Sequence, residues 1–147
     1  MLMAIVLAGA GAAQAAEGPS AVDARRGQTV ELRGHVVCVG ETGRPQECAD
    51  DARRFALRDA AGRLHPFLES DPLAAIFQDR RVRDRELVVR ARTRPDESLE
   101  IVKVYSIKEG KLHDLHYFCE VCNITAYAPG LCPCCRREME LRETPVQ

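Results

Sequence analysis

Residues 117–136 read YFCEVCNITAYAPGLCPCCR and contain five of the seven cysteines of this 147-residue chain. Four of the five form two CxxC pairs. The pairs are Cys119 with Cys122 and Cys132 with Cys135. In a tight turn, thiols at positions i and i+3 converge while backbone N–H groups point at sulfur, and two facing turns make a tetrahedral four-sulfur cage that suits Zn²⁺. The spacing therefore predicts one metal site with these four cysteines as ligands.

The same stretch resembles the zinc-ribbon or rubredoxin-like knuckle, whose two turns commonly read CxxCG and CPxCG. Here the turns read CEVCN and CPCCR: Asn123 tolerates the left-handed conformation that follows a knuckle, whereas Arg136 departs from the pattern. The resemblance implies one structural Zn²⁺. About 25 residues with little apolar content cannot form a core, so a metal would supply most of the ordering free energy, on the order of 10 kcal/mol. A closed four-thiolate site has no open position for a substrate, which disfavours metal catalysis.

Other chemistries stay open for these sulfurs. Two disulfides would be natural in an exported protein, and iron, copper or thiol redox chemistry could use the same residues. Cys134 is a surplus thiol, able to replace Cys132 or Cys135 as a ligand, to bridge a second metal or to exchange disulfides. Neither CxxC pair is followed by His, so covalent haem attachment has no support. His113 and His116 precede the first pair with helical spacing, but we interpret them as linker histidines on a solvated turn.

The amino terminus has the features of a signal peptide. Residues 1–16 carry no charged side chain, and an apolar segment leads into AQAAE at residues 13–17, which contains an A-x-A cleavage site. Such a segment is shorter than the roughly 20 residues that span a bilayer, so we expect no transmembrane segment in the mature chain. We expect residues 17–27 to form an irregular linker. We also expect the mature protein to be periplasmic or extracellular. In that oxidising environment we expect a disulfide between Cys38 and Cys48, for which the chain-entropy model gives roughly 3 kcal/mol.

Residues 28–110 have the pattern of a small, mainly β domain. Alternating apolar residues and turn signals predict strands at 30–38, 55–58, 64–68, 86–94 and 99–107, with a short helix at about 71–79. This order of elements resembles the OB-fold, a five-stranded barrel with one helix at its end; a β-roll or open sandwich is the alternative. We therefore expect an OB-like barrel at residues 28–110 and a zinc-ribbon-like module at residues 111–147. The layout also resembles small exported bacterial proteins, which implies no activity.

Composition and motifs weigh against several classes of function for this chain, namely nucleic-acid binding, lipid binding and the common enzyme families. Hydrophobic residues at 46%, charged residues at 29% and a net charge of −1 give no global attraction to nucleic acid or anionic lipid. Basic residues concentrate at 80–94 among acidic ones, which we interpret as an ion-paired strand face rather than an oligonucleotide or anion surface of the OB type. The sequence contains no GxSxG, Walker, dinucleotide or HExxH motif.

These observations predict a non-catalytic module with a structural zinc ion. We expect it to bind another protein through its barrel or ribbon surface, as a subunit of a larger complex would; nucleic acid is a disfavoured partner. The rival hypothesis is a thiol redox or metal-handling protein that uses Cys132, Cys134 and Cys135.

Overall fold

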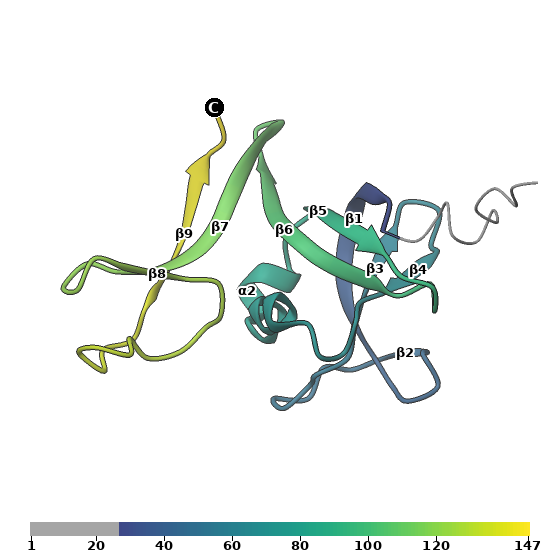
Figure 1. The fold of residues 1–147 in the computed structure, drawn as a ribbon, viewed down its shortest axis with the longest axis horizontal. Coiled ribbons are helices and arrows are strands. Elements are labelled where there is room, and N and C mark those ends of the chain that lie inside the picture. The colour runs from purple at the N-terminus through teal and green to yellow at the C-terminus, as the bar shows by residue number, and fades with distance from the viewer. Residues whose placement is uncertain (1–26) are drawn as a thin grey trace, which may run out of the picture.

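The computed structural model describes residues 27–147, which form a mainly β fold with few helical residues (Figure 1). The strands are β1 (Thr29–Val39), β2 (Pro45–Gln46), β3 (Phe55–Asp59), β4 (Leu64–Pro66), β5 (Leu87–Thr93), β6 (Leu99–Lys108), β7 (Lys111–Cys119), β8 (Ile124–Ala126) and β9 (Glu140–Pro145). A 3₁₀ helix, η1 (Pro72–Gln78), and a single α-helical turn, α2 (Arg80–Arg83), lie between β4 and β5. The predicted mainly β class is confirmed. The predicted signal peptide and all but the last residue of the predicted linker lie outside the described residues.

One antiparallel sheet runs in the order β4-β3-β1-β5-β6-β7-β8, with β2 on β1 and β9 on β7. The prediction of a closed OB-like barrel is wrong, although its order of strands and helix is present. The outer strands of the five that the sequence predicts, β4 and β6, approach each other only at a single parallel bridge between Phe67, just after β4, and Leu99. Closing a barrel needs a ladder along the last pair of strands, and β4 is too short for one because it ends at Pro66, which has no N–H to donate.

Strand β1 is strongly coiled because it pairs with β5 through its first half and with β3 through its second. Gly34 lies at the change of partner, opposite Asp59 on one side and Leu87 on the other. A Cβ atom at Gly34 would lie 2.1 Å from the carbonyl oxygen of Arg58. Only glycine allows this close approach of the two backbones.

We expect Gly34→Ala to lower the free energy of unfolding by about 2 kcal/mol, because the added methyl group meets main chain that cannot move aside. Urea denaturation followed by circular dichroism measures the change. Gly40→Ala is the matched control, since its Cβ would press only on the flexible side chain of Gln46, with the nearest backbone atom, the Arg44 carbonyl oxygen, at an ordinary contact distance of 4.0 Å. Equal losses in the two variants would contradict this account of Gly34.

The core of the described residues lies between the sheet and the helical segment that contains η1 and α2. Phe77 of η1 stacks on Phe67 with ring centroids 5.1 Å apart and meets Phe55 edge-on at 5.7 Å. Asp71 begins η1 as its N-cap, accepting the Leu73 N–H at 2.9 Å. Its second carboxylate oxygen accepts the N–H of Ile101 on β6, so one buried carboxylate fixes the helical segment against the sheet.

The C-terminal third continues the same sheet. The turn at Glu109 and Gly110, both with positive φ, joins β6 to β7, and β7 then pairs with β8 on one edge and β9 on the other. His113 and His116 lie on β7, so their interpretation as turn residues is wrong. The buried side chains of this strand, Leu115, Tyr117 and Cys119, alternate at every second position, a pattern that the three-residue spacing of the histidines does not show. The predicted division of the chain at residue 110 stays a prediction.

Candidate metal centre

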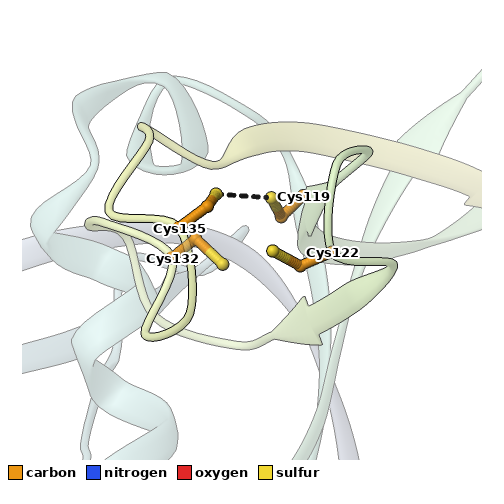
Figure 2. Close-up of side chains that lie close together, drawn as sticks. All are labelled: Cys119, Cys122, Cys132 and Cys135. Atoms are coloured by element: carbon orange, nitrogen blue, oxygen red, sulfur yellow. Dashed lines mark hydrogen bonds between the residues drawn. The ribbon is translucent and has the colours of Figure 1, made fainter.

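The two CxxC pairs lie in two loops that face each other (Figure 2). Cys119 ends β7 and Cys122 lies in the turn to β8, whereas Cys132 and Cys135 lie in the loop between β8 and β9. The four sulfur atoms lie within 4.8 Å of one another, and those of Cys119 and Cys135 are 3.5 Å apart. The structure therefore brings together the four cysteines that the sequence pairs, in a group that can hold a metal ion.

Local backbone geometry closes each loop around its two sulfurs. Cys119 pairs with Ile124 across the first turn, and Asn123 takes the left-handed conformation with φ of 54°. In the second loop, the Cys132 carbonyl accepts the N–H of Arg136 at 3.0 Å. Arg136 itself adopts φ of 63°, at the position where zinc-ribbon knuckles commonly have glycine. The departure from the zinc-ribbon pattern thus leaves the turn intact, at the cost of roughly 1–2 kcal/mol that a left-handed non-glycine residue carries.

Hydrogen bonds and burial shift the pKa values of two thiols of the cluster, Cys132 and Cys122. The backbone N–H groups of Cys135 and Cys134 point at the sulfur of Cys132 and lower the pKa of this buried thiol to about 7. The pKa of Cys122 is raised instead, first by its hydrogen bond with the thiol of Cys134 and then by burial. N–H groups directed at sulfur also stabilise a metal-bound thiolate, so this donor set fits a borderline or soft cation.

The remaining two cysteines form a separate cross-link. The sulfurs of Cys38 and Cys48 lie at disulfide distance, with their Cα atoms 5.3 Å apart. Cys38 is buried near the end of β1, and Cys48 lies in the exposed loop that contains β2. The predicted pairing is thus present in the structure, and it leaves five free thiols in the described residues.

A buried tyrosine connects the metal centre to the helical segment, which lies between the two loops and the rest of the sheet (Figure 1). Tyr117 of β7 is 1% exposed, and its hydroxyl donates to Asp79 at 2.8 Å. Asp79 is the N-cap of α2 and also accepts the backbone N–H of Arg81 at 2.8 Å. Neither Tyr117 nor Asp79 belongs to a sequence motif. The spacing of Leu115, Tyr117 and Cys119 at every second position is, however, a signal from which burial of Tyr117 could have been predicted.

A second anchor is the carboxylate of Glu143 on β9. It accepts hydrogen bonds from Arg85 at 2.9 Å, from the Ser106 hydroxyl at 2.7 Å and from Lys108 at 3.1 Å. Burial alone would raise the pKa of Glu143, but these three donors outweigh it and hold the pKa at about 2. The last strand, which follows the second cysteine loop, is therefore fixed to the turn after α2 and to β6.

The basic residues at 80–94 are occupied by contacts within the protein. The ion pairs are Arg80 with Asp84, Arg81 with Asp79, Arg85 with Glu143, Arg90 with Glu31, and both Arg92 and Arg94 with Glu100. Arg83 donates to the carbonyl oxygens of Phe77 and Gln78. The predicted ion-paired surface is confirmed.

Comparison with models of protein families, with curated proteins and with solved structures finds no match to this chain. Within residues 27–147, no helix has the length and apolar character needed to cross a membrane.

Proposed function

We propose that this protein is an exported, non-catalytic module whose C-terminal part is held together by one structural Zn²⁺ and which works by binding or assembling with another protein. The ligands would be Cys119, Cys122, Cys132 and Cys135. The observation that carries the proposal is the convergence of their four sulfurs, within 4.8 Å of one another, from two facing turns. Four protein ligands fill a tetrahedral zinc site and leave no position for water or substrate, which favours a structural role over a catalytic one.

The composition of the second cysteine loop supports a structural ion. Within residues 130–138 the only buried side chain is Cys132, and Cys135 is half-buried. The one large apolar side chain that the loop between β8 and β9 buries is Met139, at its last position before β9. Binding of a metal by its sulfurs is then the main source of its ordering free energy, as in other small metal-dependent modules.

The disulfide-bonded cysteines and the four clustered thiols, taken together, support a protein that is exported and binds a metal ion. A disulfide between Cys38 and Cys48 belongs to an oxidising compartment, in agreement with the predicted signal peptide. In that compartment four thiols so close together would oxidise to one another unless something held them as thiolates. A bound metal ion does so.

Exposed apolar side chains near the cysteines support a protein partner. The large hydrophobic residues exposed in residues 27–147 are Val121, Tyr127, Leu131 and Val146. Val121 and Leu131, with 61% and 54% of their surface exposed, lie in or beside the two cysteine loops. The ion-paired arginines, by contrast, offer little free positive charge to an oligonucleotide.

Metal and thiol analysis of the native protein tests this proposal. We expect plasma mass spectrometry to find one zinc ion per chain after purification without added metal. We expect alkylation after metal removal to count five free thiols, with Cys38 and Cys48 protected. A metal-free preparation in which the cluster cysteines are linked to one another, and the loops are still ordered, would refute it.

A thiol redox or metal-handling role is the second candidate, favoured by one observation. Cys134 is an exposed thiol that lies in the chain between two of the proposed ligands, Cys132 and Cys135. A protein with this role would give up its ion to an acceptor or reduce a test disulfide, whereas a structural site retains its ion through purification.

A further inference from the structure

A cavity of about 200 Å³ lies where β6 and β7 separate from each other. The two strands pair from their turn only as far as Tyr105 and Asp114, and beyond this point they diverge (Figure 1). Strand β7 pairs with β8 instead as it approaches Cys119. The cavity is thus enclosed by side chains of β6, β7, η1 and the residue that follows β8.

The walls of this cavity are apolar. Ile76, Val104 and Leu115 belong to the buried core, and Leu73 and Val102 are half-buried. Protein interiors are otherwise close-packed, with few voids larger than a water molecule. An apolar cavity of about 150 Å³ is enough to bind benzene. The size and the lining of the cavity therefore suit a compact apolar group of about one ring.

Two polar side chains, Lys103 and Tyr127, complete the lining. The Lys103 ammonium lies 3.1 Å from the Tyr127 hydroxyl and 4.6 Å from the centre of its ring, and it donates to the Asp114 carboxylate at 2.9 Å. An ammonium has three N–H donors, and a phenol has one O–H donor that can rotate. Within residues 27–147 the structure shows two acceptors for Lys103 and none for the Tyr127 proton. Both side chains therefore keep a donor for a ligand.

The ion pair between Lys103 and Asp114 decides which kind of acceptor these donors suit. The two side chains carry opposite charges and are each about one quarter exposed, so together they add no net charge beside the cavity. A carboxylate ligand would bring a second negative charge close to Asp114, and the repulsion is stronger beside apolar walls than in bulk water. An uncharged carbonyl or hydroxyl oxygen accepts the same donors without this repulsion.

We propose that this cavity is a binding site for a small, compact apolar molecule that carries one uncharged oxygen acceptor. The apolar part of the ligand fills the space between Ile76, Val104 and Leu115. Its oxygen accepts the O–H of Tyr127, with the remaining N–H of Lys103 as a second donor. The site goes beyond the proposed metal-stabilised module and does not rest on it, because none of the lining residues is a proposed ligand of the metal.

Titration of the isotope-labelled full chain, followed by NMR of its backbone amides, tests the inference. Acetophenone, a phenyl ketone, represents the proposed class, and benzoate is the charged probe of similar size. We expect acetophenone to shift the amide signals of Val104 and Leu115 until they saturate, and benzoate to bind roughly tenfold more weakly or worse. The inference is overturned if acetophenone does not bind, or if benzoate binds equally well. Zinc analysis of the same sample tests the proposed function separately.

Substitutions test the position of the ligand. Val102→Phe places a ring in the cavity and should lower the affinity for acetophenone by roughly tenfold or more. Tyr127→Phe removes the O–H donor and should lower the affinity roughly fivefold. Tyr105→Phe is the matched control and should bind as the parent does, because this half-buried tyrosine of β6 does not line the cavity. Parent-like binding by Tyr127→Phe, or by folded Val102→Phe, would count against the site. The test stands on Tyr127→Phe alone if the larger side chain prevents folding, since Tyr127 is 40% exposed.

Discussion

Replacement of Cys119 by serine is expected to abolish metal binding and to disorder the two cysteine loops. The reason is that a serine hydroxyl does not replace a thiolate in a zinc site, and residues 130–138 bury no side chain except Cys132. The free energy at stake for such sites is on the order of 10 kcal/mol. Plasma mass spectrometry measures the zinc content, and hydrogen exchange measures the protection of the loops.

The rest of the protein should survive this change. Strands β1, β3, β5 and β6 share a core with Phe77 and Val82 of the helical segment, and the Cys38–Cys48 disulfide lies on that side of the molecule. We therefore expect strong protection from exchange at β1 and β5 in Cys119→Ser. Chelation of zinc from the parent should give the same pattern, whereas Cys134→Ser, the matched control, should keep both metal and protection. Ordered loops in metal-free protein would contradict the structural role.

The early strands could be predicted because each is either an alternation of apolar residues or, in β3 and β4, a short apolar run, with turn signals between them. Strand β5 shows the alternation in part: its fully buried residues Leu87, Val89 and Ala91 stand at every second position, although Val88 between them is buried as well. Strand β2 has two residues and no pattern, and it exists only because it pairs with the end of β1. Strand β7 has the alternation at Leu115, Tyr117 and Cys119, but the polar residues between them, with two histidines three positions apart, lead to the prediction of a solvated turn.

Closure of the barrel could not be predicted, because it depends on lengths rather than on patterns. Strand β4 ends at Pro66 after three residues, and β6 runs on to Lys108 and into the hairpin with β7. These two facts leave the sheet open and extend it toward the cysteines. The resemblance to the OB-fold lies in the order of strands and helix along the chain. That order shows neither the shortness of β4 nor the extension of β6.

The candidate ligands were visible in the sequence, whereas the anchors that hold the site in place were not. Cysteine pairs with fixed spacing are a local signal, and the chemistry of sulfur restricts what they can do. Tyr117 and Asp79 are 38 positions apart, and Glu143 and Arg85 are 58 apart. Such pairs are single polar residues of common types, and only the folded topology shows that they meet.

The anchor at Glu143 should give a stability that depends on pH. The pKa of Glu143 is about 2, against an ordinary value of 4.5, because of hydrogen bonds from Arg85, Ser106 and Lys108. A carboxyl whose pKa is lower in the folded state stabilises the protein fully above its unfolded pKa, here about 4.5, and loses that contribution as the pH falls toward 2. The shift corresponds to a stabilisation on the order of 3 kcal/mol at neutral pH.

We therefore expect Glu143→Gln to lower the free energy of unfolding by about 3 kcal/mol at pH 7, with the gap to the parent narrowing as the pH falls below about 4.5 and closing near pH 2. Denaturant titrations of both proteins across this range measure the gap, and the comparison cancels the proton uptake by the thiolates that both share. Glu140→Gln on the same strand is the control: its carboxylate is 66% exposed in its pair with Arg142, so its removal should cost less than about 1 kcal/mol. A gap for Glu143→Gln that stayed constant with pH would mean that the shape and hydrogen bonding of this side chain, rather than its charge, hold β9 in place.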